Sequence, residues 1–416
     1  MTVVLSDVTA TGRTPASGYA SGMTDLRIGV AGLGLRRSLA AEAHRPGAGS
    51  RVTAVCDTDT STWDWARERF GDVLTFKDFG DMLTADLDAV LILTPDDTHV
   101  TLGGQALSAG VATFMEKPLA TRIEDCDTLL ELARRHRTRL YVGHNMRHMP
   151  VVRTMRELIA EGAVGEVQAI WCRHFVGHGG DFYFKDWHAD RRRTTGLLLQ
   201  KGAHDIDVIH WLAGAASREV TAMGKLSVYN RITDRQAREG DRPADWYDPA
   251  ANWPPLSQRG LHPVVDVEDL SMMLMRLDNG VQASYQQCHY TPDYWRNYTV
   301  IGTEGRLENF GDTGPEAVVK VWNLKRRGHD PDADRVVPVP VSRGGHGGAD
   351  AGLIDEFCRF VRHGGATDTS PIAARDSVAA GIVATQSIRE GGRNRAVPMP
   401  DAELAAYYRN GQPGSR

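Results

Sequence analysis

Residues 26–40 read LRIGVAGLGLRRSLA and decide the fold of the first half of the chain. An apolar run enters a turn at Gly32, Leu33 and Gly34, and a segment with helix-forming Leu and Ala follows at once. This pattern predicts a strand, a tight turn and a helix. Because glycine has no Cβ, a pyrophosphate can reach the backbone N–H groups of such a turn and the positive end of the helix. The alternative is an ordinary turn between strand and helix.

A second strand, VTAVC, ends at Asp57, about 23 residues after Gly34. An acid at this place can accept hydrogen bonds from the adenosine ribose hydroxyls. Arg37 replaces the third glycine of G-x-G-x-x-G. Arg36 and Arg37 leave open a contact with a 2′-phosphate, but Asp57 would repel that phosphate, so we expect NAD rather than NADP. From this region we expect cofactor contacts from Gly32, Leu33, Gly34, Leu35, Arg36 and Asp57.

Strands and helices alternate after Asp57, which predicts a doubly wound parallel sheet. Residues 87–95, LDAVLILTP, form a nearly all-apolar strand of the kind that helices cover on both faces. A later strand, VATFMEKP, ends at the E-K-P turn. Ligands bind beyond the carboxyl ends of such strands. We therefore expect further cofactor contacts from Thr94, Pro95, His99, Glu116 and Lys117.

The second half has the pattern of an antiparallel sheet. MLMRL and VQASY flank DNG at 278–280, which is a hairpin signal, and further alternating runs surround them. Residues 177–196 are aromatic and charged without a clean period, which predicts a long loop. Residues 234–265 form a polar insertion rich in Pro and Trp, typical of a lid, a subunit contact or a disordered segment.

Length and composition bound the function. The 416 residues are 41% hydrophobic and 24% charged, as in ordinary globular proteins, and suffice for two domains. The net charge of −5 and the absence of like-charge blocks argue against nucleic acid as a partner. No apolar run approaches the roughly 20 residues that cross a bilayer. Five scattered cysteines without C-x-x-C indicate a cytoplasmic protein, and no metal-ligand spacing is present. We expect a flexible tail (1–24), an NAD(P)-binding domain (25–146), a substrate and oligomerisation domain (147–395) and a polar tail (396–416).

The chain resembles the glucose-fructose oxidoreductase and inositol dehydrogenase family, Gfo/Idh/MocA, over roughly residues 26–395. The resemblance is carried, in chain order, by GVAGLGLR, CDTD, LDAVLILTPDDTHV, EKPLA, VGHNMRHMPVV, KGAHDIDVIHWL, YTVIGTEGRLEN and ARDSVAAGIVATQSIREG. It implies an N-terminal Rossmann domain and an α+β C-terminal domain with a large, open, mostly antiparallel sheet that often mediates oligomers. A homo-oligomer, dimer or tetramer, is therefore expected. It also implies NAD or NADP chemistry on a sugar, cyclitol or related polyol.

Carried over by motif, Lys117 would sit beside the nicotinamide and the reacting carbon, and His204 would be the general acid/base. Removing hydride from a secondary alcohol requires loss of the hydroxyl proton, and histidine suits that task. A lysine ammonium near the same oxygen stabilises the developing alkoxide. Asp207 lies three residues after His204, within reach to orient it. The family commonly has an aspartate where this chain has Gln200, which cannot take a proton.

The substrate contacts are expected in two segments and on one helix. Lys201 is a candidate either as a substitute proton carrier or as a substrate contact. Arg191, Arg192 and Arg193 either bind an acidic substituent or are solvated, and His289 and Tyr290 are weaker candidates. The expected substrate contacts are His144, Asn145, Arg147, Tyr183, Trp187, Lys201 and Asp207, with Lys185, Asp186 and His188 in the same loop as Tyr183 and Trp187.

Three functions compete. The leading one is an NAD-dependent dehydrogenase that oxidises one hydroxyl of a sugar, sugar derivative or inositol. The second is a redox-neutral glycosidase that keeps NAD bound, oxidises C3, eliminates the aglycone, adds water and reduces the sugar again. The third is a cofactor-binding sensor, which would not need proton carriers at both Lys117 and His204.

Overall fold

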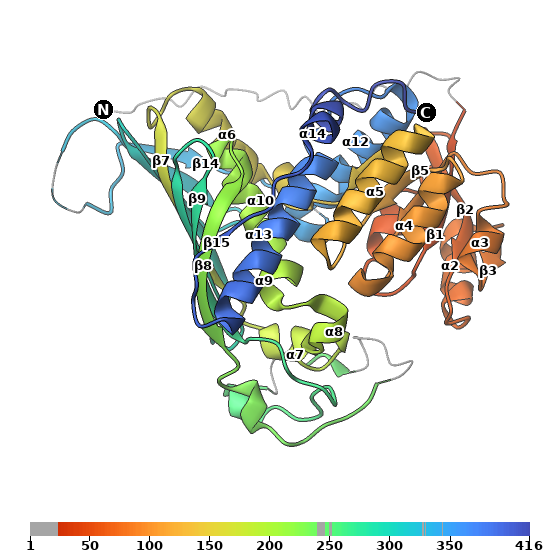
Figure 1. The fold of residues 1–416 in the computed structure, drawn as a ribbon, viewed down its shortest axis with the longest axis horizontal. Coiled ribbons are helices and arrows are strands. Elements are labelled where there is room, and N and C mark those ends of the chain that lie inside the picture. The colour runs from red at the N-terminus through yellow and green to blue at the C-terminus, as the bar shows by residue number, and fades with distance from the viewer. Residues whose placement is uncertain (1–23, 239–245, 249–251, 327, 329, 343) are drawn as a thin grey trace, which may run out of the picture.

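The computed structural model describes residues 24–238, 246–248, 252–326, 328, 330–342 and 344–416. Residues 1–23 of the expected N-terminal tail lie outside the described residues. The described part of the molecule contains two sheets, the larger at the left of Figure 1 and the smaller at the right. Helix α13 (Pro371–Arg389) runs between them (Figure 1).

The smaller sheet is the expected doubly wound parallel sheet. Its strand order is β3-β2-β1-β4-β5-β6, and all five pairings are parallel. Because the order reverses between β1 and β4, a crevice for ligands opens at the carboxyl ends of these two strands. The strands are β1 (Leu26–Ala31), β2 (Ser50–Cys56), β3 (Leu74–Phe76), β4 (Ala89–Ile92), β5 (Ala112–Met115) and β6 (Leu140–Val142). The helices between them are α1 (Arg37–Glu42), α2 (Thr62–Phe70), α3 (Phe79–Met82), α4 (His99–Ser108) and α5 (Ile123–His136).

The larger sheet has nine strands in the order β14-β13-β12-β11-β7-β10-β9-β8-β15. Only β7 and β10 pair in parallel among the described strands of this sheet, so the expected antiparallel character is confirmed. The predicted hairpin is present as β9 and β10, with Met275 opposite Ala283. The strands are β7 (Val167–Phe175), β8 (Ser217–Lys225), β9 (Leu270–Leu277), β10 (Gln282–Cys288), β11 (Trp295–Gly302), β12 (Arg306–Phe310), β13 (Val318–Trp322), β14 (Arg335–Pro338) and β15 (Arg395–Ala396).

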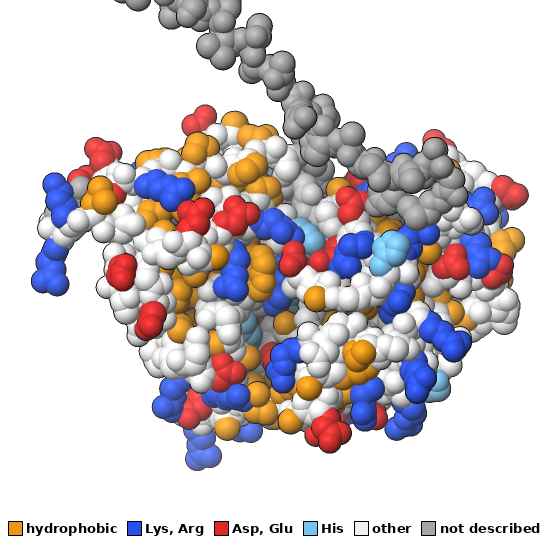
Figure 2. Space-filling view, turned by 90° about the horizontal axis from the view of Figure 1, so that it is seen from above, with side chains coloured by type: hydrophobic (Ala, Val, Ile, Leu, Met, Phe, Trp, Pro, Cys, Tyr) orange, Lys and Arg blue, Asp and Glu red, His pale blue; other side chains and the backbone are white. Residues whose placement is uncertain are grey.

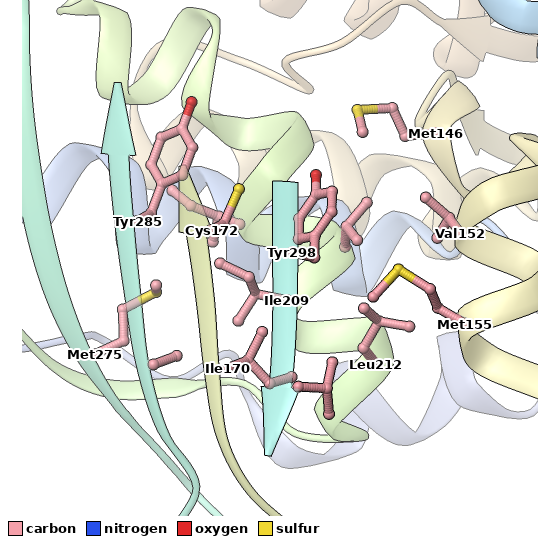
Figure 3. Close-up of a cluster of buried hydrophobic side chains, with 14 of the residues drawn as sticks. Met146, Val152, Met155, Ile170, Cys172, Ile209, Leu212, Met275, Tyr285 and Tyr298 are labelled. Atoms are coloured by element: carbon pink, nitrogen blue, oxygen red, sulfur yellow. The ribbon is translucent and has the colours of Figure 1, made fainter. Parts of the chain in front are cut away.

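One face of the larger sheet is covered by helices α6 (Pro150–Ala160), α10 (Gly202–Ala213) and α13. Figure 3 shows the core that they form with the strands, where side chains such as Ile170, Ile209 and Met155 meet. Helix α13 also reaches the core of the first domain through Val378 and Ile382. A helix that is buried on both sides fixes the two domains relative to each other.

The end of the chain corrects one expectation. Residues 396–416 were expected to form a polar tail, but they contain helix α14 (Ala402–Arg409), whose N-terminus Asp401 caps. Leu404 and Tyr408 enter the core of the first domain, and the Tyr408 hydroxyl donates to the Leu130 carbonyl (2.6 Å). Helix α12 (Ala349–His363) packs on the same domain through Phe357. Helix α14 was missed because its order depends on such contacts with distant parts of the chain.

The segment 177–196 is also more ordered than a long loop. It forms the short helices α7 (Gly179–Tyr183), η3 (Trp187–Ala189) and α8 (Arg191–Thr194), and α9 (Leu197–Gln200) follows. Described parts of the 234–265 insertion pack over it, with Leu261 buried against Phe184. The insertion residues 239–245 and 249–251 lie outside the described part. The remaining short helices are η1 (Asp96–Thr98), η2 (Asn145–His148), η4 (Tyr229–Arg231), η5 (Pro255–Ser257) and η6 (Gly345–Gly348).

The surface and helices add two findings. On the face shown in Figure 2, Lys and Arg side chains are interspersed with Asp and Glu, so this face carries no field of a single sign. Within the ranges that the structure describes, no helix combines the length and apolar character needed to span a bilayer.

Candidate active site

The turn after β1 has the shape expected of a dinucleotide cradle. Gly32 has φ +87°, and a Cβ there would lie 3.0 Å from the backbone of Leu93. A Cβ on Gly34 would meet no described atom within 4 Å, so this side of the turn is open. Asp57, at the end of β2, accepts a hydrogen bond from the Leu33 N–H (2.7 Å). The open side of the turn at Gly34, beside a carboxylate, fits a pyrophosphate and its neighbouring ribose.

Arg36, expected to contact the cofactor, is held by protein groups. Its guanidinium bonds to Glu116 and, through two nitrogens at 3.0 and 3.1 Å, to Asp350 of α12. Although burial disfavours the carboxylate, the charge of Arg36 keeps the pKa of Glu116 below its ordinary value. The bridge ties the glycine turn to the E-K-P turn. The next expected residue, Leu35, is 41% exposed.

The segment after β4 is braced by its own side chains. Thr94 Oγ1 lies 2.6 Å from Thr98 Oγ1, and Pro95 begins the single turn η1. His99 is fully buried, with Nδ1 2.7 Å from the Pro118 carbonyl and Nε2 3.0 Å from that of Thr94. A neutral imidazole donates only one hydrogen bond, so one of these contacts is the bond and the other is packing. His99 therefore joins the two turns that border the crevice.

Lys117 reaches from the first domain to the second. Its ammonium donates to the backbone carbonyl of Gln200 (2.9 Å), and burial lowers the pKa of this lysine. Glu116 accepts a hydrogen bond from the Lys117 N–H (2.6 Å). Asp96, which the sequence did not single out, is 4% exposed, and burial raises the pKa of its carboxyl to about 7 against the opposing charge of Lys117. Two groups with strongly shifted proton affinity thus adjoin one another.

His204 stands one helical turn after Gln200. It is 8% exposed, and its Nδ1 has no hydrogen-bond partner among the described residues. Burial, with the charges of Lys117 and Lys201, keeps the pKa of the imidazole well below its usual range. The ring centroid of His144 lies 6.2 Å away. His204 is therefore a neutral imidazole at pH 7, with an unprotonated ring nitrogen that can act as an acceptor.

Asp207 contacts different partners from the one expected. It forms a buried bidentate pair with Arg147, with distances of 2.7 and 2.5 Å, and its Oδ2 lies 3.3 Å from His144 Nδ1. No hydrogen bond or ion pair joins it to His204 among the described side chains. Asp207 thus holds His144, the neighbour of His204, and Arg147 is occupied in this pair. Buried Asn145 donates to Asp350 (3.2 Å).

The segment 177–196 supplies an aromatic wall. The Tyr183 ring lies 5.2 Å from the rings of both His188 and His289, and Lys201 Nζ lies 5.9 Å from its centroid. Trp187 stacks on His188 at 3.9 Å. The structure therefore brings the expected residues Tyr183, Trp187 and Lys201 together.

Arg296 of β11 is a residue that the sequence missed. It is 7% exposed, and its Nε lies 3.0 Å from Asp205 Oδ1. Asp205 also accepts hydrogen bonds from the hydroxyls of Tyr285 and Tyr298, and lies 3.0 Å from His174 Nδ1. Figure 3 shows both tyrosine hydroxyls pointing toward the same end of the core. An arginine in an alternating strand gives no sequence signal of such burial.

The arrangement can bind an alcohol and remove its proton. The Lys117 ammonium bonds to the segment just before α10, close enough for its charge to lower the pKa of the neutral His204 imidazole. A dinucleotide held by the glycine turn would supply a hydride acceptor. Within the described part of the chain, no group of three or more His, Cys, Asp or Glu side chains is placed to hold a metal ion.

Two curated relatives are named as an oxidoreductase and as a dehydrogenase. The chain is 23% identical to YteT of Bacillus subtilis (strain 168), named as an oxidoreductase, over 74% of this chain and 81% of that protein. It is 29% identical to the inositol 2-dehydrogenase of Rhizobium meliloti (strain 1021), over 50% of this chain and 61% of that protein.

A solved levoglucosan dehydrogenase in complex with NADH and L-sorbose has the same fold. It superposes with a TM-score of 0.73 at 19% identity, covering 91% of this chain and all of that one. At this identity the likeness establishes the fold. The sequence model described as "Oxidoreductase family, NAD-binding Rossmann fold" matches residues 26–144, and the "GFO/IDH/MocA C-terminal domain" matches residues 152–308. The chain therefore belongs to the Gfo/Idh/MocA family of NAD-binding oxidoreductases.

Proposed function

We propose that the protein is an NAD-dependent dehydrogenase that transfers hydride between a hydroxyl of a sugar, sugar derivative or cyclitol and nicotinamide. The observation that carries this proposal is the pairing of Lys117 with His204 across the two domains. Lys117 follows β5 beside the crevice, and its ammonium bonds to the helical segment one turn before His204. The names of the two relatives above, an inositol 2-dehydrogenase and a levoglucosan dehydrogenase, support this substrate class.

The residues divide the work of proton transfer. His204 accepts the hydroxyl proton, because its imidazole is neutral at pH 7. Lys117 donates a hydrogen bond to the same oxygen and stabilises the charge that develops there. Gln200 fixes the lysine through its backbone carbonyl. Asp96 lies beside the lysine and favours its charged form. Bound NAD would supply the hydride acceptor.

Two observations support NAD over NADP. Asp57 places a carboxylate beside the glycine turn, where a 2′-phosphate would be repelled. Arg36 is engaged with Glu116 and Asp350, and the Arg37 guanidinium lies 5.1 Å from the centroid of the Trp65 ring. We expect NADH to bind more tightly than NADPH in a fluorescence titration. Tighter binding of NADPH would contradict this preference.

We also propose that a second copy of the chain covers the outer face of the larger sheet. This face exposes Trp171, Met223, Met272 and Leu274 at 48 to 73%. Along β9, Met272 and Leu274 alternate with buried side chains, as expected for a strand with one face in the core. An apolar patch of this kind on a sheet is typical of a subunit interface.

The five cysteines are all free, which supports a reducing, cytoplasmic setting for the protein.

The test of the proposed activity is a substrate panel. Purified protein is mixed with NAD and with sugars, inositols and aryl glycosides, while NADH absorbance and aglycone release are followed together. We expect NADH to accumulate with a free sugar or inositol. Release of aglycone under catalytic NAD, with no NADH accumulating, would establish the redox-neutral glycosidase instead.

A further inference from the structure

Each Lys and Arg side chain of the segment 177–196 is paired with a neighbouring carboxylate. Arg191, Arg192 and Arg193 were candidates for binding an acidic substituent and Lys185 for contacting the substrate, but each has a protein partner. The pairs are Arg191 with Asp266 (3.1 Å), Arg192 with Asp190 (2.5 Å), Arg193 with Asp97 (3.3 Å) and Lys185 with Asp181 (2.8 Å). None of these side chains is left to neutralise a bound anion.

Lys201 differs from all of them. Its side chain is partly buried, and within the described part of the chain its ammonium makes no hydrogen bond or ion pair; the contact it does make is with the Tyr183 ring, at 5.9 Å. Burial and the nearby charges of Arg296 and Lys117 lower the pKa of Lys201 to about 7. The charges of Asp205 and Asp312 act in the opposite direction but do not outweigh burial and the two cations, so a bound anion would stabilise the ammonium.

The acids of this region offset the cations around Lys201 only in part. Asp205 is already surrounded by Arg296, His174 and two tyrosine hydroxyls. Asp312 accepts from the Tyr294 hydroxyl (2.6 Å) and lies 3.8 Å from Arg296. Both carboxylates are thus shared among several donors, and neither forms an ion pair with Lys201 among the described residues.

The wall beside Lys201 is built to bind polar groups. His188 and His289 are 2% and 0% exposed, and neither Nδ1 has a hydrogen-bond partner among the described residues. Buried polar atoms of this kind normally find partners. Both rings pack against Tyr183, the ring that Lys201 also contacts. Hydroxyl groups of a sugar ring beside a charged substituent would match these atoms.

We propose that Lys201 binds a carboxylate of the substrate, so that the protein oxidises a sugar acid or an acidic cyclitol in preference to the neutral counterpart. This inference rests on the proposed dehydrogenase function and names its substrate class. The secondary C–OH becomes a carbonyl, with the hydride passing to NAD and the hydroxyl proton to His204. The carboxylate is unchanged by the reaction and serves to hold the ring.

The experiment uses matched pairs, such as glucuronate with glucose and galacturonate with galactose, and acidic cyclitols with inositols. The ratio of kcat/KM for acid and neutral partner is measured with NAD for the full-length protein and for Lys201→Gln. The control is Lys325→Gln, which removes an equal charge from an exposed residue after β13. We expect Lys201→Gln to lower kcat/KM for the acid about ten- to hundredfold and for the neutral partner by less than about threefold. The control should leave both unchanged.

Two outcomes would overturn the inference while the proposed function stands. One is a wild-type protein that oxidises the neutral partners as well as or better than the acids. The other is a Lys201→Gln variant in which kcat/KM falls equally for the acid and its neutral partner, because Lys201 would then act in proton transfer or in folding. Lys201→Arg keeps the charge and should keep the preference for acids, and thermal unfolding checks each variant. If the wild type oxidises no member of any pair, although it binds NADH, the proposed function and this inference fail together.

Discussion

The glycine turn allows the fold and the cofactor site to be tested separately. Gly32 and Gly34 are two residues apart, yet a methyl group on each would have a different effect. At Gly32, φ is +87° and the new Cβ would lie 3.0 Å from the Leu93 backbone and 2.9 Å from Thr94 Cγ2. At Gly34, the Cβ would meet nothing within 4 Å. Only the first substitution should therefore strain the folded protein.

The magnitude for Gly32→Ala follows from three contributions. The left-handed backbone costs about 1–2 kcal/mol for a residue with a Cβ. Contact with the backbone of Leu93, which cannot move without disturbing β4, adds about 1–3 kcal/mol. The lower entropy of the unfolded chain returns about 0.4–1 kcal/mol. The expected net loss is about 2–4 kcal/mol, whereas Gly34→Ala should change the free energy of unfolding by less than about 0.5 kcal/mol.

Urea unfolding and NADH titration of the two variants together form the assay. Gly32→Ala should lower the urea midpoint without changing the slope. Gly34→Ala should unfold like the wild type but bind NADH at least about tenfold more weakly, because its methyl group would stand between the pyrophosphate and the backbone N–H groups. The reasoning is refuted if Gly34→Ala binds NADH with wild-type affinity, or if it is destabilised as much as Gly32→Ala.

Four further predictions follow from named contacts. Lys117→Met should lower kcat by about 10²- to 10⁴-fold while NADH titration shows retained binding, and unchanged turnover would exclude its role. Asp205→Ala should cost about 3–5 kcal/mol in urea unfolding, because it removes the nearer of the two carboxylates beside the buried Arg296 guanidinium; a loss below about 1 kcal/mol would contradict this. Leu274→Glu should shift the protein to a smaller species in analytical ultracentrifugation, and an unchanged mass would place the interface elsewhere. Affinity for a sugar acid relative to its neutral partner should fall as pH rises above about 7, by up to about tenfold per unit, because Lys201 then loses the proton that pairs with the anion; a flat ratio would exclude that pairing.

Much of the fold could be read from local patterns. The glycine turn, the all-apolar strand before Thr94 and the DNG hairpin each depend on neighbouring residues, and all three are present. Helix α14 was missed because distant parts of the chain hold it in place. Its Tyr408 bonds to Leu130 of α5, and Gln412, which follows the helix, bonds to Leu140 of β6. A polar segment that gains its order from distant partners carries no local signal.

The candidate site was predictable in composition but not in pairing. Lys117 and His204 were indicated by motif, and they lie close enough for the lysine to lower the pKa of the histidine. Helical spacing wrongly predicted His204 as the partner of Asp207. The carboxylate is instead paired with Arg147, which comes from the short helix η2. Asp96 and Arg296 were missed because their importance depends on burial. The sequence around a charged residue in a loop or a strand gives no sign that it is buried.

The stoichiometry of NADH formed per molecule of substrate consumed tests the central claim most directly. It would be measured with the best substrate from the panel, by following NADH absorbance while the remaining substrate is quantified by chromatography. A dehydrogenase predicts one NADH for each substrate oxidised, and Lys117→Met should form NADH in the same ratio but about 10²- to 10⁴-fold more slowly. Consumption of substrate with no net NADH would contradict the account and would assign the Lys117 and His204 pair to redox-neutral chemistry.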